Sequence, residues 1–394
     1  MYTEYMKRIY LDYASLTPID PRVIREMKKY SSSDFANPSS LYKEGVAAKK
    51  ALEVGRSAVA AFLHAHADEI VFTSGGTEAN GLALEGAGRT AHRNGFEKPH
   101  LIISAIEHSS VIETAAMMEK HGVEVTRISV DPKGTISLEE LKKALKPSTF
   151  MISIMAVNNE VGSIQPLKDI AKIVRDYRKA RTDGKNQYPV FHCDAAQAPL
   201  YLDLNMEKLG IDLLTLDGAK SYGPRGIGCL YVRRNTPIEQ IIYGGGQERS
   251  LRSGTENIPA IMGFAKALGI ASKDREKEAV RIAVLRRQFI EGLKLIRKDI
   301  HVNGSELMSN DNQSCHVLNV SIPGIDNEFF VLQLDARGVA CSTKSSCLRD
   351  EDESYVLKAM GIDSRASIRF SFGRWTKKGD IALTLKKIKE ILAK

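Results

Sequence analysis

The chain has 394 residues, of which 43% are hydrophobic and 26% are charged, and its 56 basic and 48 acidic residues leave a net charge of +8. A chain of this length and composition can bury a large core, which favours two domains or one large and one small domain. The positive excess is moderate and dispersed, so it permits an acidic partner without requiring direct contact with nucleic acid.

Cysteine usage and the apolar pattern indicate a reducing compartment. The five cysteines are an odd number without a close-spaced pair, which argues against a disulfide framework, and the lack of a CxxC motif argues against a structural zinc site. Residues 1–15 lack the apolar core of a signal peptide, and no run approaches the ~18 apolar residues of a membrane span. We therefore predict a cytoplasmic protein with no metal site and no membrane contact.

Strand and helix patterns alternate over the first two thirds of the chain. A short strand is predicted at residues 9–12, and a helix at 39–65 with Ser39 or Ser40 as its N-cap. Further strands are predicted at 69–73, 100–105, 123–128, 150–157, 188–193 and 213–216, with helices at 109–120, 137–145 and 167–181. Apolar strands that alternate with amphipathic helices predict an α/β fold with a mostly parallel sheet and helices on both faces.

Polar and charged residues follow several of these strands. Those at or just past a predicted strand end are Thr77, His108, Asn159, Asp194 and Lys220. Ligands of open parallel sheets bind beyond the C-terminal ends of the strands, so we expect these residues to share one site. Each alone also has an ordinary interpretation, because a single Asp often caps a turn and a single Lys is usually solvated.

The stretch from Asp194 to Lys220 suggests the chemistry of this site. An acid and a lysine, each at a strand end, suit an aldehyde cofactor with a basic ring. The lysine can form a Schiff base with the aldehyde, and the carboxylate can keep the ring nitrogen protonated so that the ring acts as an electron sink. The glycine-rich turn at residues 74–80 is typical of an anion site at a helix start. It is equally consistent with a tight turn that needs glycine.

After about residue 260 the pattern changes to α+β, with helices at 279–298, 328–336 and 377–393 and strands at 316–322 and 367–372. We predict a large domain over residues 21–262 and a smaller domain over 1–20 and 263–394, which carries a cysteine loop at about 341–354. Cys347 has small, polar and charged neighbours there, which favours a reactive thiol over a core residue. Cys341 lies on the strand side of the loop and is expected to be structural.

Several segments of the chain resemble those of one protein family, both in their residues and in their order along the chain. They include VFTSGGTEANGLAL, IEHSSVIET, AVNNEVGSIQP, HCDAAQA, GAKSYGPRGIGCLYVRR, GGGQERSLRSGTEN and SIRFSFGR. In this order they resemble the NifS/IscS-type cysteine desulfurases, which are pyridoxal-phosphate (PLP) enzymes of the class V aminotransferase-like group. The resemblance runs from about residue 8 to the C-terminus and implies the PLP-dependent transferase fold of type I.

The resemblance implies how the cofactor is held. Lys220 matches the Schiff-base lysine, and Asp194 matches the acid that pairs with the pyridine nitrogen. Gln197 and Asn159 match side chains that lie near the phenolic oxygen of the ring. His108 matches an imidazole that stacks on the ring. The phosphate-binding turn matches Gly76 and Thr77. Thr255 matches a threonine that reaches the phosphate of the partner subunit, so a homodimer is expected.

The resemblance also implies the reaction. Arg369 matches the arginine that binds the substrate carboxylate as a bidentate fork, with Asn37 nearby. Cys347 matches the thiolate that takes the sulfur. The implied enzyme converts L-cysteine to L-alanine and passes a persulfide to an acceptor protein, for iron–sulfur cluster assembly or tRNA thiolation. Alternatives on the same fold are a selenocysteine lyase, an aminotransferase, which needs no loop thiol, and a scaffold that has lost its cofactor.

Two positions depart from the family pattern. Asp217 and Ala219 stand where the family has a serine and a histidine that both contact the phosphate. Ala219 cannot make that contact, and a carboxylate at Asp217 would repel a phosphate unless it is turned away or paired. Each lost contact costs about 1.5–3 kcal/mol, so we expect weaker cofactor binding, with Ser221 and Arg225 as candidate replacements.

Overall fold

The computed structural model describes residues 8–32, 35–306, 312–343 and 353–393. Its largest sheet has seven strands in the order β2-β8-β7-β6-β5-β3-β4. They are β2 (Ile70–Thr73), β3 (His100–Ser104), β4 (Glu124–Ile128), β5 (Thr149–Ser153), β6 (Val190–Asp194), β7 (Leu213–Asp217) and β8 (Gly228–Val232). Strand β8 runs antiparallel to β2 and β7, and the other pairs are parallel. The predicted mostly parallel α/β sheet is confirmed.

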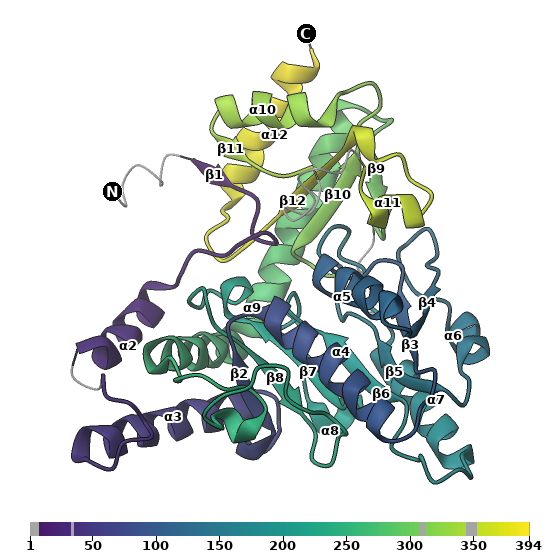
Figure 1. Ribbon diagram of the computed structural model, residues 1–394. Helices are drawn as coiled ribbons and strands as arrows, with labels where there is room; N and C mark the ends of the chain where they lie inside the picture. Colours follow the sequence, from purple (N-terminus) through teal and green to yellow (C-terminus); the bar gives the residue numbers. More distant parts are fainter. Residues whose placement is uncertain (1–7, 33–34, 307–311, 344–352, 394) are drawn as a thin grey trace.

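Helices cover both faces of this sheet because successive strand residues point to opposite sides. On one face, α4 (Gly76–Arg93) and α5 (Ser109–Lys120) pack on residues such as Leu101 and Met151. On the other, α3 (Lys43–Phe62), α7 (Leu167–Ala180) and the first half of α9 (Ile258–Ile296) pack on residues such as Ile102 and Ile152. Figure 1 shows α4 crossing in front of the sheet. This sandwich buries every strand except the edge strand β4 and leaves the strand ends for a site.

A second core lies beyond the upper end of the large sheet in Figure 1. Its sheets are β12-β10-β9, formed by β12 (Ser367–Ser371), β10 (Val317–Ser321) and β9 (His301–Asn303), and β1-β11, formed by β1 (Ile9–Tyr10) and β11 (Val339–Ala340). The helices of this core are the second half of α9, α10 (Asn327–Ala336) and α12 (Lys378–Leu392). Helix α11 (Tyr355–Ala359) packs instead in a small separate cluster with Ile106 and Val161. Helices α2 (Pro21–Ser32), α6 (Leu138–Ala144) and α8 (Met206–Leu209) complete the described helices longer than a single 3-10 turn.

Two helix starts differ from those predicted. Helix α3 begins at Lys43 rather than at residue 39, because residues 37–40 close a turn of their own through the Asn37 carbonyl and side chain. Helix α9 begins at Ile258, where Asn257 caps it, and not at residue 279. Its first half is buried on most sides, as Ile261, Phe264 and Leu268 are, and such a segment lacks the polar stripe that reveals a helix.

The predicted boundary between residues 262 and 263 falls inside α9, and the division into two domains stays a prediction. In the described part of the chain, none of the helices combines the length and apolar character that crossing a membrane requires.

Gly86 and Gly81 in α4 test how closely this helix is packed. An added Cβ at Gly86 would lie 2.5 Å from the Glu239 carbonyl oxygen, whereas at Gly81 nothing lies within 4 Å. We expect Gly86→Ala to destabilise the protein by about 1–3 kcal/mol through overpacking. Gly81→Ala should stabilise it by about 0.5–1 kcal/mol, because alanine loses less backbone freedom in a helix. Urea unfolding measures both, and equal effects of the two changes would contradict this packing.

Candidate active site

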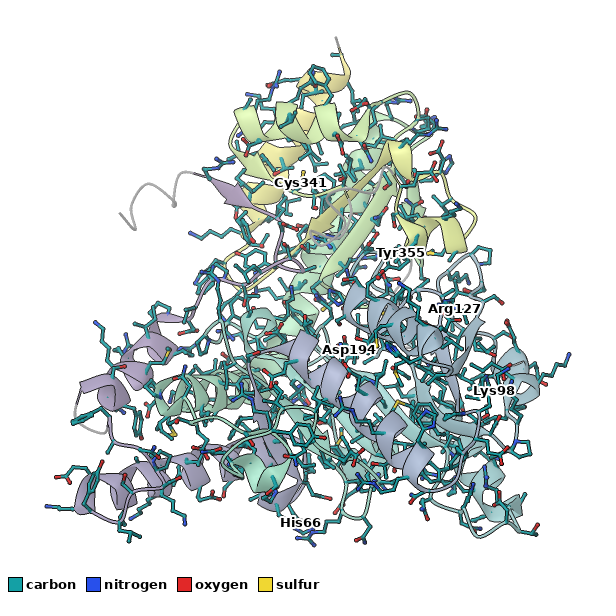
Figure 2. The ribbon with its side chains drawn as sticks, viewed as in Figure 1. His66, Lys98, Arg127, Asp194, Cys341 and Tyr355 are labelled. Atoms are coloured by element: carbon teal, nitrogen blue, oxygen red, sulfur yellow. The ribbon has the colours of Figure 1, made fainter. Side chains whose placement is uncertain are left out.

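One cavity lies at the C-terminal ends of β5, β6 and β7 and collects most of the predicted site residues. Those that line it are Gly76, Thr77, His108, Asn159, Asp194, Gln197, Lys220 and Arg369. Asn37 and Thr255 are exposed and lie outside the lining, and Cys347 falls outside the described residues. In Figure 2, Asp194 is at the upper end of the large sheet, below the part of the molecule that carries Cys341.

Asp194 ends β6 and is buried, at 6% exposure. Its Oδ1 accepts a hydrogen bond of 2.9 Å from the Ala196 N–H, and its Oδ2 accepts one of 2.7 Å from Asn80. A buried carboxylate needs such donors, because it has lost its hydration. Burial also raises the pKa of the neighbouring Glu107 to about 8. Glu107 is therefore largely neutral at pH 7.

Lys220 closes the short turn Gly218–Lys220 directly after β7. Because β6 and β7 are parallel neighbours, their ends deliver Asp194 and Lys220 to the same edge of the sheet. The Lys220 Nζ donates to the Ser15 carbonyl oxygen, and the side chain faces the cavity. A primary amine is thus held in the same space as the buried carboxylate.

A hydrogen-bond chain joins His108 to Asp194. Asn80 donates from Nδ2 to both the Asp194 carboxylate and the Ser110 hydroxyl, at 2.7 and 2.8 Å. The Ser110 hydroxyl lies 2.8 Å from Nδ1 of His108, and the same Nδ1 accepts from the Ser110 N–H. Since Nδ1 is an acceptor, the neutral imidazole carries its proton on Nε2. The orientation of His108 is therefore fixed by α4 and α5 together.

A second chain fixes Gln197. Its Nε2 donates to the Ala14 carbonyl oxygen at 2.8 Å, so its Oε1 faces Nε2 of His316 at 3.1 Å. Burial lowers the pKa of His316 to about 3, with a smaller contribution from Arg369, so the ring is neutral at pH 7. His316 must then donate from Nε2 to Gln197, while its Nδ1 accepts from the Ser314 hydroxyl at 2.5 Å. Tyr201 stacks on the His316 ring at 4.6 Å.

Arg369, on β12, brings a buried cation to the cavity at 1% exposure. One terminal nitrogen donates to the Asn159 carbonyl oxygen at 3.0 Å, and the other donates to Asp12 Oδ1 at 2.8 Å. Its Nε is buried and has no hydrogen-bond partner among the described residues. A guanidinium has five N–H groups, so this arrangement leaves donors for an incoming carboxylate.

The comparisons with known proteins agree with this geometry. The family model described as "Aminotransferase class-V" matches residues 9–383. The chain belongs to the class-V aminotransferase family. It is 38% identical to "Cysteine desulfurase IscS" of Dictyoglomus turgidum over 99% of this chain and 96% of the relative.

Two solved structures of similar proteins extend the comparison. One named "NIFS-LIKE PROTEIN" matches with a TM-score of 0.89 and 34% identity, over 98% of this chain and 99% of the other. A second, named "SspA in complex with cysteine", matches with a TM-score of 0.77 and 34% identity, over 92% of this chain and 98% of the other. Each of these structures matches nearly the whole of this chain, and the matched part is therefore much larger than the site alone.

Class-V aminotransferases of this kind depend on PLP, and the residues of the cavity fit that cofactor. The donor set holds a carboxylate for a basic ring, an amine for an aldehyde and, at Gly76 and Thr77, the N-terminus of α4 for a phosphate. One group does not follow the pattern, because the Asp217 side chain also lies against that N-terminus.

Sequence reasoning missed the residues that orient the site. Asn80, Ser110 and His316 act through partners 30 to 119 positions away in the chain. Asn80 stands inside the glycine-rich turn segment, and Ser110 follows the IEH motif, so their positions could have been noted. His316 had no such signal, because only the fold brings β10 to Gln197.

His316 tests the importance of the Gln197 orientation. The change His316→Phe keeps a ring beside Tyr201 but removes the donor to Gln197. We expect the Kd for PLP to rise about five- to tenfold, the value of one net hydrogen bond, and the pH at which the absorbance band of the bound cofactor changes to shift. Absorbance titration measures both, with the exposed His121 changed to Phe as control. Equal results for the two variants would contradict the orienting role.

Proposed function

We propose that the protein is a PLP-dependent cysteine desulfurase that converts L-cysteine to L-alanine and carries the sulfur as a persulfide on Cys347. The observation that supports this most is the cavity itself, where Asp194, Lys220 and Arg369 meet. Relatives at 38% identity are named cysteine desulfurases, and one similar structure is named as a complex with cysteine.

The chain's own residues supply the positions that the reaction needs. When bound, PLP supplies an aldehyde and a protonated ring that withdraws electrons from the substrate Cα. Asp194 would hold the proton of the ring nitrogen, and Gln197 would donate its second amide N–H to the phenolic oxygen. Lys220 would move a proton at the substrate Cα, and His108, whose Nδ1 accepts from the Ser110 N–H, would pack against the cofactor ring. Asn159 completes this edge of the cavity.

Arg369 binds the substrate carboxylate. Its guanidinium is buried, and the carbonyl of Asn159 and the carboxylate of Asp12 fix its plane. A planar guanidinium held in this way presents its remaining N–H groups in a fork that matches a carboxylate. In this proposal Asn37, on the exposed turn before α3, also binds the substrate.

The sulfur moves from the substrate to Cys347. The Cβ–S bond of the substrate breaks, an S–S bond to Cys347 forms, and the carbon keeps the electron pair and takes up a proton, which gives alanine. The described thiols suit this step poorly. Cys193, Cys229 and Cys315 are buried and Cys341 is half-buried, and burial raises the pKa of all four, to about 12 for Cys315. Thiolates are the nucleophiles.

A homodimer completes the site in this proposal, and an acceptor protein for iron–sulfur cluster assembly or tRNA thiolation takes the sulfur. Phe35, Leu41, Tyr42 and Val46, before and at the start of α3, are exposed, with Leu41 at 96%. Exposed apolar residues so close together support an interface. A groove beside them is lined by residues 245–249 and Glu256, next to Thr255, which in this proposal reaches the partner's cofactor. We infer a cytoplasmic location.

Two cysteine variants test the proposal. Cys347→Ser should lower alanine formation from L-cysteine by about a hundredfold or more, because the nucleophile is lost, and should keep the PLP absorbance. The control Cys341→Ser should keep both. Alanine is measured by chromatography and the persulfide by mass spectrometry of the intact protein after cysteine is added.

Alanine formation at the wild-type rate in Cys347→Ser would refute the role of Cys347. Loss of activity in Cys341→Ser, with the persulfide of the wild-type protein mapped to Cys341 in a digest, would move the role to that residue. Amino-group transfer to a keto acid without release of sulfur would replace the desulfurase proposal by an aminotransferase.

A further inference from the structure

Asp217 lies where the phosphate of the cofactor is expected. It ends β7, and its Oδ1 accepts a hydrogen bond of 2.9 Å from the Ala219 N–H. The carboxylate also lies against Gly76, the first residue of α4. An added Cβ at Gly76 would lie 3.5 Å from Asp217 Oδ2. The side chain is therefore not turned away but is seated on the helix N-terminus.

The N-terminus of α4 accounts for this position. The helix has 18 residues, and its N-cap is Gly75, which has no side chain to satisfy the first N–H groups. These groups and the helix dipole attract an anion. Asp217 provides one from the neighbouring strand, as a phosphate would from the cofactor. The two anions therefore compete for the same N–H groups.

The charged groups around Asp217 do not neutralise the negative charge of its carboxylate. Burial raises the pKa of Asp217 and nearby Asp194 raises it further, while the Ala219 and Gly76 N–H groups and Lys220 lower it. Glu78, in the first turn of α4, is already paired with Arg252 at 2.7 Å. His108 also lines the cavity, on its α5 side. A phosphate that enters beside a charged Asp217 would meet a second negative charge at the same N–H groups, and the nearby amine of Lys220 would be engaged with the aldehyde.

The candidate replacements do not relieve this conflict. The Ser221 hydroxyl is buried and donates to the backbone oxygen of Asp217 at 3.2 Å. Arg225 is exposed and does not line the cavity. Ala219 offers only its N–H, which Asp217 already uses. The phosphate can bind the N–H groups at the start of α4 only if Asp217 is protonated or its side chain moves away from them.

We propose that Asp217 couples cofactor binding to proton uptake: the phosphate of PLP binds at the N-terminus of α4 when Asp217 takes a proton from solvent. The protonated carboxyl then donates its O–H to a phosphate oxygen instead of repelling it. This proposal rests on the proposed function in one respect, that PLP is the cofactor. The phosphate should therefore add little affinity at high pH and more at low pH.

The ratio of two dissociation constants isolates this effect. Pyridoxal carries a hydroxyl in place of the phosphate, so Kd(pyridoxal) divided by Kd(PLP) measures what the phosphate contributes. Absorbance titrations of the full-length protein are made from pH 6 to 8.5 with wild type, Asp217→Asn and Asp217→Ser. We expect Asp217→Asn to raise the ratio about tenfold or more at pH 8, because a charge repulsion is replaced by a neutral amide.

The pH dependence gives a second readout. In wild type the ratio should rise by up to about tenfold per pH unit as the pH falls, the limit for uptake of one proton. In Asp217→Asn this rise should be smaller. The second ionisation of the phosphate, with a pKa of about 6, affects all proteins alike and cancels in the comparison. Glu78→Gln removes the same charge from the same helix turn but from a neutralised pair, and it should leave the ratio close to wild type.

The outcomes separate this proposal from the proposed function. Equal ratios and equal pH slopes in wild type, Asp217→Asn and Asp217→Ser, with PLP bound by all, would overturn the role of Asp217 and leave the desulfurase untouched. Absence of a PLP absorbance change in both wild type and Asp217→Ser would overturn the cofactor and both proposals with it. Far-ultraviolet circular dichroism confirms that the variants are folded, and Asp217→Asn can still accept the Ala219 N–H through its amide oxygen.

Discussion

The parallel pairing of β6 with β7 is the constraint on which the site depends. It places the ends of two neighbouring strands at one edge of the sheet, where one delivers a buried carboxylate and the other an amine. The carboxylate of Asp194 is held in place by hydrogen bonds from Asn80 and the Ala196 N–H. Asp194 and Lys220 are 26 positions apart in the chain. They therefore meet because their strands pair in the fold, and not because they are close in sequence.

The N-terminal segment joins this edge to the rest of the molecule. The Leu11 carbonyl accepts from the Ser371 N–H of β12, and the Ser371 hydroxyl accepts from the Ala14 N–H. The next carbonyls accept from Gln197 and Lys220. Residues 11–15 therefore bind Gln197 and Lys220 through their carbonyl groups and also bind β12, the strand that carries Arg369. The spacing between the two halves of the site is set by this stretch.

The sequence predicted those helices and strands that show a clear apolar pattern within their own segment. The helix at residues 109–120 and the strands before Asp194 and Lys220 were predicted from apolar runs and caps, and the structure confirms them. The start of α9 was missed because burial on most sides removed the amphipathic pattern. Motif resemblance named residues that bear the chemistry, but it could not show which of them share a cavity. The lining supplies that grouping for all but Asn37, Thr255 and Cys347.

The residues that orient the site were beyond sequence reasoning for a physical reason. His316 supports Gln197 across 119 positions, and its neutral state follows from burial that only the folded chain provides. For Asp217 the sequence left two alternatives, a carboxylate turned away or one that is paired. The choice between them depended on the position of α4 relative to β7, which brings Gly76 against the carboxylate.

The most direct test of the central claim is to locate the covalent bond between cofactor and protein. Protein saturated with PLP is reduced with borohydride, which makes an imine bond permanent, and is then digested and mapped by mass spectrometry. The account predicts the pyridoxyl mass on the peptide that contains Lys220, and its loss in Lys220→Ala. A label on another lysine, with Lys220 unmodified, would contradict the account.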